Sequence, residues 1–168
     1  MDPLWTQLQT LLTCAATELT AAAVPVPANV AVVHGQVAWD DCCEGQLWVR
    51  VVRSWPSSTF PLKDSTLRPC GTRTATQIGL GILRCATDLD TLGWASNPSM
   101  AALTADARLG ICDIGALYRA LACCDDLDTR VVDQWTPLGP QGGCFGGEWT
   151  AWLAGSLSCP DESPGSGS

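Results

Sequence analysis

Apolar residues return every three or four positions near the N-terminus, which is the spacing of one face of an amphipathic helix. The stripe consists of Leu4, Leu8, Leu11, Leu12, Ala15, Leu19 and Ala22. It predicts a helix over positions 3–23. The run Val24-Pro25-Val26-Pro27 ends this helix, because a proline disfavours helical geometry in the residue before it.

A second helix is predicted over positions 99–124, with Ser96 or Asn97 as its cap. Its apolar stripe is expected to be Leu103, Ala107, Ile111, Ile114, Tyr118 and Leu121. Asp106 and Asp113 lie off this stripe, seven residues apart. A pair of carboxylates can perform acid–base chemistry, but a solvated helix face is the commoner explanation and is the one expected here.

Alternation of apolar and other residues predicts five strands, over positions 30–35, 47–55, 76–85, 129–136 and 148–155. In the second strand Leu47, Val49 and Val51 should face one side, with Trp48, Arg50 and Val52 on the other. In the third strand Gly79 and Gly81 alternate with the apolar positions. Two glycines on one face leave room for a helix or another backbone to pack closely.

Two segments share a similar build. Positions 40–53 and 142–153 each begin with a polar or glycine-rich turn that carries cysteine, and each continues into a strand that contains tryptophan. We expect these two strands to be partners at the centre of one sheet. The segment 137–147 should form a hairpin turn with glycines at positive φ. It lacks the Gly-Lys-Ser/Thr ending of a phosphate-binding loop.

The order helix-strand-strand-strand-helix-strand-strand predicts an α+β fold: a mainly antiparallel mixed sheet with two long helices packed on one face. We expect one domain over positions 1–155 and a disordered tail over 156–168. Positions 56–75 show no periodicity and contain Lys63, Arg68 and Arg73. A loop of this length in a compact domain is usually functional or disordered.

Composition narrows the classes of function. The formal net charge is −8 and the basic residues are scattered, which argues against a nucleic-acid-binding protein. No apolar run approaches the length of a membrane span, and the first ten residues lack the basic start of a secretory signal. We therefore expect a soluble protein that is made in a cytoplasm and binds no membrane.

The chain has ten cysteines but no Cys-x-x-Cys motif, so no zinc site is expected. Most of the cysteines are expected to be small buried apolar residues. One or two disulfides are the alternative if the protein ends in an oxidising setting, and Cys43 with Cys144 is the first candidate because both lie in turns at the base of the central strands.

His34 is the only histidine, and no second nitrogen ligand accompanies it. We expect no catalytic, metal or cofactor site. A cysteine-dependent enzyme is an alternative of another class, but no motif orients a cysteine toward this histidine. A secreted disulfide-rich binding protein is disfavoured by the missing signal.

Several motifs resemble a small structural protein of long-tailed bacteriophages of actinobacteria, encoded among the head–tail connection genes. The motifs are Asp41-Cys42-Cys43-Glu44-Gly45-Gln46-Leu47-Trp48-Val49-Arg50-Val51, Leu83-Arg84-Cys85, Trp135-Thr136-Pro137-Leu138-Gly139-Pro140-Gln141-Gly142-Gly143-Cys144 and Gly147-Glu148-Trp149-Thr150. The element order is also similar to that of the tail-terminator family. The likeness covers nearly the whole chain to about position 155.

This resemblance implies a non-enzymatic protein that forms a hexameric ring at the head-proximal end of the tail tube. Such a ring ends tube growth and presents a surface to the head connector. The alternative is another neck protein, a head–tail stopper or an adaptor, although stoppers tend toward small barrels with fewer helices. The family has no catalytic, cofactor or metal residues to carry over.

The expected partners are other copies of the chain, the tail tube protein and the stopper or connector proteins of the head. Genomic DNA should pass through the ring without specific binding, which suits the acidic charge. The expected location is the virion neck, with assembly in the host cytoplasm. Candidate contacts to neighbouring subunits or the tube lie on one sheet face and in the loop 56–75: Trp48, Arg50, Arg53, Trp55, Lys63 and Arg68. An exposed sheet face with stacked Arg and Trp is the structural alternative.

Overall fold

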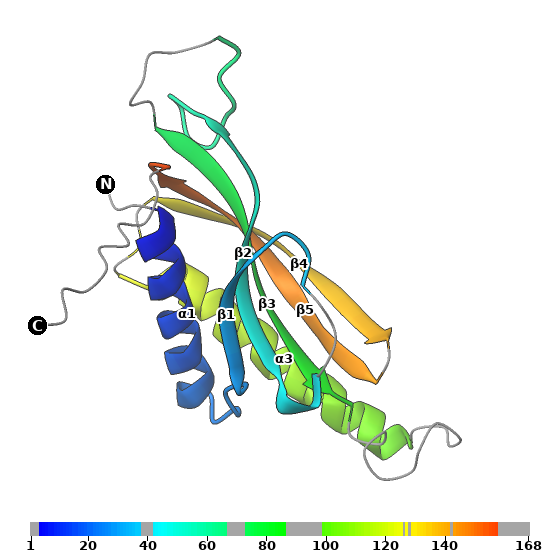
Figure 1. Ribbon diagram of the computed structural model, residues 1–168. Helices are drawn as coiled ribbons and strands as arrows, with labels where there is room; N and C mark the ends of the chain where they lie inside the picture. Colours follow the sequence, from blue (N-terminus) through cyan, green and yellow to red (C-terminus); the bar gives the residue numbers. More distant parts are fainter. Residues whose placement is uncertain are drawn as a thin grey trace, which may run out of the picture.

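The computed structural model describes residues 4–37, 42–66, 73–86, 99–125, 127, 129–141 and 143–157. Its elements follow the predicted order (Figure 1). They are α1 (Leu4–Ala21), β1 (Asn29–His34), the 3₁₀ turn η1 (Cys42–Glu44), β2 (Gln46–Pro56), β3 (Thr74–Cys85), α3 (Met100–Cys123), β4 (Arg130–Gln141) and β5 (Cys144–Gly155). The predicted α+β class is confirmed.

The five strands form one mixed sheet in the order β1-β2-β3-β5-β4. β1 runs parallel to β2, and every other neighbouring pair is antiparallel. The expectation that β2 and β5 are direct partners is wrong, because β3 lies between them. Apart from its two end residues, β3 is buried along its whole length, as expected of a central strand.

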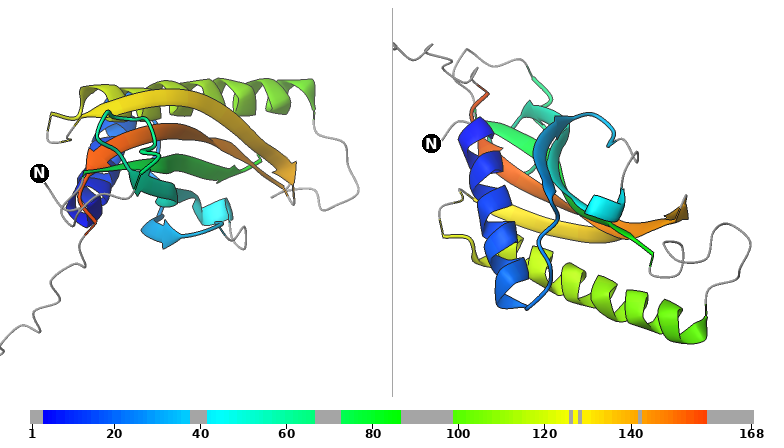
Figure 2. Two further views of the ribbon diagram at one scale, coloured as in Figure 1. Left: turned by 90° about the horizontal axis from the view of Figure 1, so that it is seen from above. Right: turned by 60° about the horizontal axis from the view of Figure 1, so that its bottom comes forward.

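Both helices pack on one face of the sheet, as predicted (Figures 1 and 2). The predicted stripe of α1 is buried from Leu4 to Leu19, and Gln7 joins it by donating a hydrogen bond to the carbonyl of Ala154 (3.2 Å). The sheet supplies apolar side chains from three strands: Leu47, Val49, Ile78, Leu80, Ile82, Ala151 and Leu153. Burying each large aliphatic side chain stabilises the fold by about 1.5–3 kcal/mol.

The packing of α3 differs from the prediction. Its buried residues are Asp113, Ala116, Leu117, Ala120 and Leu121, all in its second half. The predicted stripe residues Leu103, Ile111 and Tyr118 are exposed. The stripe is confirmed at Leu121, which is buried. It is wrong in the first half of α3, which α1 and the sheet do not cover, and at Tyr118, which packs against Trp149 but stays exposed. The cap is Ser99, whose hydroxyl accepts from the Ala102 N–H (3.1 Å); the predicted caps lie outside the described residues.

The β4–β5 hairpin is longer than predicted. Residues 137–141 and 144–147 continue the two strands, so the turn shrinks to the link between Gln141 and Cys144. Glycines do take positive φ here, at Gly139 (98°) and Gly143 (80°), as predicted. The other expected loop, 56–75, is shortened by β2 and β3; its residues 67–72, and the tail from residue 158, lie outside the described part of the chain.

Candidate functional site

The sheet face opposite the helices holds a partly buried charged cluster that spans three strands. Arg50 of β2 donates from Nε and Nη2 to the two carboxylate oxygens of Glu148 on β5 (2.7 and 2.8 Å), and the Trp48 indole N–H donates to Glu148 Oε2 (2.8 Å). Arg50 also reaches the carbonyl of Gly35 (3.3 Å). Bidentate pairs of this kind fix geometry as well as charge.

Two glycines of β3 make this cluster possible. A Cβ at Gly79 would collide with the Glu148 carboxylate, and a Cβ at Gly81 would collide with the Trp48 ring. The predicted close approach over these glycines is therefore confirmed, and side chains from both flanking strands occupy most of the space. Hydrogen bonding to Glu148 raises the pKa of the Arg50 guanidinium, which stays charged.

A second cluster, made of one cationic and two aromatic side chains, lies farther along the same face. The Arg53 guanidinium lies 5.1 Å from the ring centre of Trp55 and 5.4 Å from that of Trp152, and it donates to Gln77. A bulge at Val52 puts Arg53 on this face, because the extra residue shifts the alternation between Val51 and Arg53. Without the bulge Arg53 would point toward the helices.

The predicted contact residues fall into three groups. Trp48 retains only 2% of its accessible surface, so it is removed from the candidate contacts. The remaining described ones, Arg50, Arg53, Trp55 and Lys63, are partly or fully exposed and stay predictions. Arg68 lies outside the described residues.

The loop that follows β2 is held by its own hydrogen bonds. The Trp55 indole donates to the Pro61 carbonyl (3.1 Å), and the Asp64 N–H donates to the Pro56 carbonyl (2.9 Å). Ser58 donates from its N–H and its hydroxyl to Asp64 Oδ1 (3.0 and 2.7 Å). We call residues 57–66 the arm. The neighbouring side chain of Leu62 is 65% exposed.

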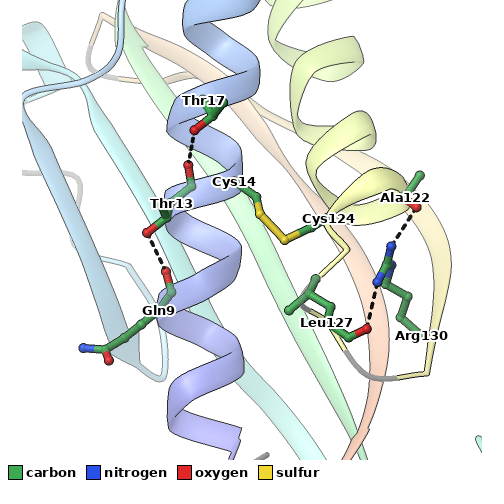
Figure 3. The surroundings of a disulfide bond; sticks show 8 residues. All are labelled: Gln9, Thr13, Cys14, Thr17, Ala122, Cys124, Leu127 and Arg130. Atoms are coloured by element: carbon green, nitrogen blue, oxygen red, sulfur yellow. Dashed lines mark hydrogen bonds between the residues drawn. A yellow bond between two sulfur atoms is a disulfide. The ribbon is translucent and has the colours of Figure 1, made fainter.

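Six cysteines of the described chain form three disulfides: Cys14–Cys124, Cys42–Cys144 and Cys43–Cys85. The expectation that most cysteines are simple buried residues is wrong for this part. Among the described residues, Cys112 and Cys123 are free and exposed. Figure 3 shows Cys14–Cys124 joining α1 to the end of α3, where Arg130 donates to the carbonyls of Ala122 (2.8 Å) and Leu127 (3.1 Å).

The predicted Cys43–Cys144 pairing is wrong by one residue. Cys85 and Cys144 are register partners on the neighbouring strands β3 and β5. The adjacent cysteines of η1 therefore meet two sulfurs, and Cys42 bonds to Cys144 while Cys43 bonds to Cys85. The sequence shows the adjacent pair but not the strand between β2 and β5, so it could not assign the partners.

The expectation that Asp113 belongs to a solvated helix face is also wrong. Asp113 is 1% exposed and accepts two hydrogen bonds from Arg84 of β3 (2.7 and 2.8 Å), and Arg84 also donates to the Pro25 carbonyl (2.8 Å). Burial raises the pKa of the Asp113 carboxyl, and the hydrogen bonds and charge of Arg84 oppose this rise. This buried salt bridge links α3 to β3 of the sheet.

An apolar groove of about 330 Å³ lies between the first half of α3 and the β4–β5 hairpin. It is lined by the residues that the sequence placed in a buried stripe, with aromatic walls from the hairpin; the main ones are Leu103, Ala107, Ile111, Ile114, Trp135 and Phe145. Asp106 also lines it. The helical spacing indicated an apolar face correctly, but it could not show that the core formed by the described residues leaves the first half of α3 uncovered.

Comparison with known proteins adds no relative: no protein-family model matches the chain, and no curated protein matches it. Within the described residues, no group of three or more His, Cys, Asp or Glu side chains could bind a metal ion. None of the helices in the described part is long and apolar enough to cross a membrane.

Proposed function

We propose that this chain is a structural protein of a long-tailed phage virion, which forms a hexameric ring at the head-proximal end of the tail tube. There it ends tube growth and joins the tail to the head connector. The proposal rests on the resemblance to the tail-terminator family and on the α+β fold, whose element order agrees with that resemblance.

One observation carries the proposal: the motifs of the resemblance meet in space. The Cys-Cys-Glu-Gly-Gln-Leu-Trp-Val-Arg segment and the Gly-Gly-Cys…Gly-Glu-Trp segment are about a hundred residues apart in the sequence. They are joined by Cys42–Cys144 and by the contacts of Glu148 with Trp48 and Arg50. A protein that shares these motifs needs the same three-strand arrangement, so likeness in the motifs supports likeness in the fold.

Two further features suit a virion protein. Disulfides persist in the oxidising surroundings outside a cell, and a released virion stays in such surroundings. The net charge of −8 suits a ring through which DNA passes without sticking, because acidic walls repel phosphate.

The direct test is tube assembly with and without this chain. Purified tail tube protein should polymerise into long, uneven tubes alone, and the added chain should cap the ends and stop elongation, as measured by electron microscopy. Tubes that grow equally long in its presence would contradict the proposal.

Particles assembled without the chain provide a second test. Overlong tails are expected if the chain is a terminator. Tails of normal length that fail to attach to filled heads would instead indicate a stopper or an adaptor.

A further inference from the structure

The arm and the β4–β5 hairpin that lines the groove lie toward opposite ends of the sheet (Figure 1). The arm follows the end where Pro56 pairs with Thr74, whereas the groove adjoins the end where Leu83 pairs with Gly146. Ten steps of β2 separate the two ends, roughly 33 Å at about 3.3 Å per residue. A chain therefore cannot place its own arm in its own groove.

The arm is built to present an apolar side chain beside a cation. Its internal hydrogen bonds fix its backbone, and Leu62 and the next residue, Lys63, are both exposed. A fixed loop loses less conformational entropy on binding than a mobile one. Arg53 and Arg73, both exposed, flank the arm along the chain, so this end of the molecule gathers positive charge.

The groove offers the complementary chemistry. Ile111 is 69% exposed and Leu103 is 44% exposed, and the walls are almost wholly apolar. Asp106 lines the groove on the same helix, whereas Arg108 does not. An apolar side chain accompanied by positive charge therefore suits this lining.

We propose that the arm of one copy docks in the groove of the next, with Leu62 among the groove's apolar side chains and Lys63 near Asp106. This inference deepens the proposed function, on which it rests, by naming the contact that builds the ring. The two surfaces differ, so the contact is head-to-tail, and repetition of it gives a closed ring when the rotation between copies allows closure. It also brings the basic end of one acidic chain against an acidic side chain of its neighbour, which reduces the repulsion between copies.

The test uses the oxidised full chain, with its mass in solution measured by light scattering after size exclusion and by native mass spectrometry. The unmodified chain should assemble. Leu62→Asp and Ile111→Asp should each remain monomeric, because each puts a carboxylate into an apolar contact. Val26→Asp is the matched control: Val26 is 39% exposed but belongs to neither surface, so this variant should assemble normally. Circular dichroism checks that all three variants are folded.

Mixing the two monomeric variants gives the sharper result. Leu62→Asp keeps an intact groove and Ile111→Asp keeps an intact arm, so the mixture should form one-to-one heterodimers and nothing larger. An unmodified chain that stays monomeric, variants that both keep the assembled mass, or a mixture without heterodimers would each overturn the docking contact.

These outcomes are distinct from those for the proposed function. A ring that survives both substitutions and still caps tubes would leave the terminator proposal standing without this contact. Assembly that depends on Leu62 and Ile111, in a protein that does not stop tube growth, would support the contact and contradict the terminator.

Discussion

Two glycines of the central strand make room for the Glu148 carboxylate and its hydrogen-bond donors on the outer face of the sheet. Gly79 and Gly81 sit on the central strand, and their missing Cβ atoms let Glu148 and Trp48 meet above that strand from either side. The carboxylate is matched by donors from two residues of β2, which compensates for its loss of hydration. At this scale, the space left by the glycines is as important as the side chains that occupy it.

Replacing either glycine by alanine should therefore destabilise the protein. Gly79→Ala and Gly81→Ala should each lower the free energy of unfolding by about 1–3 kcal/mol, because the new methyl group displaces Glu148 or Trp48. Urea denaturation followed by tryptophan fluorescence measures the change. The matched control is Gly115→Ala in α3, where the added Cβ meets only the tip of Arg119 at 3.7 Å; it should be stabilising by about 0.5–1 kcal/mol. Equal losses at all three positions would contradict the explanation.

The buried pair of Arg84 and Asp113 gives a prediction with a pH dependence. Arg84→Met should cost about 3–5 kcal/mol, because it leaves the Asp113 carboxylate buried without its partner. The double variant Arg84→Met with Asp113→Leu should recover most of this loss, since no unpaired charge then remains.

The sign of the pH effect follows from burial. In Arg84→Met nothing opposes the desolvation that raises the pKa of Asp113, so its folded pKa lies further above the unfolded value than in the unmodified protein. A raised carboxyl pKa gives stability that is present below the unfolded pKa and lost as pH rises through the folded one. The destabilisation by Arg84→Met should thus be smallest near pH 4 and grow toward pH 7. A loss that shrinks as pH rises would refute this account.

At the scale of elements, periodicity predicted the order and type of the two α-helices and five strands among the described residues, because the buried face of an element shows in its spacing. It failed where burial depends on distant elements. The first half of α3 has a regular apolar stripe that the described part of the chain leaves uncovered, whereas Asp113 lies off the stripe yet is buried against Arg84.

The prediction of which cysteines pair failed for a related reason. The sequence placed β2 beside β5, and only the full strand order shows that β3 lies between them and brings Cys85 next to Cys144. The glycine pair in β3 did signal a close approach, although the groups that approach could not be named from sequence. Local spacing thus predicts elements well, but it does not determine which elements become neighbours.

Single cysteine replacements can test the pairing. In Cys42→Ser, Cys43 should stay bonded to Cys85 and Cys144 should become a free thiol; in Cys43→Ser, Cys144 should stay bonded and Cys85 should become free. Alkylation under non-reducing conditions followed by peptide mass spectrometry locates the freed thiol. A bond between Cys43 and Cys144 in the Cys42→Ser variant would revive the pairing that the structure rejects.

At the scale of the whole molecule, the disulfides join parts of the chain that are far apart in sequence. Cys14–Cys124 spans 110 residues and Cys42–Cys144 spans 102. Crosslinks of this span restrict the unfolded chain strongly, so they add stability that neither the helices nor the sheet supplies alone. The fold is therefore held by covalent bonds between its two helices and at one end of the sheet, as well as by its core.

The stability lost when one of these disulfides is removed should be measurable. The double replacement Cys14→Ser with Cys124→Ser should lower the free energy of unfolding by about 3–5 kcal/mol, mainly by freeing the unfolded chain. Thermal unfolding with and without reductant measures it, and the variant should respond less to reductant than the unmodified protein. Identical responses would mean that this bond carries none of the effect.

The bond between Cys14 and Cys124 also decides which part of the chain carries mechanical load. A pull on the two termini passes from α1 through this bond into β4 and β5, so β1, β2, β3 and α3 lie off the line of force. Reducing all three disulfides should release roughly 360–400 Å of additional extension at about 3.3–3.6 Å per residue, whereas breaking Cys14–Cys124 alone would leave Cys42–Cys144 to bypass most of that length. An optical-trap recording before and after reduction would measure this hidden length directly. Under a pull on its two termini, most of the protein would thus be shielded from tension.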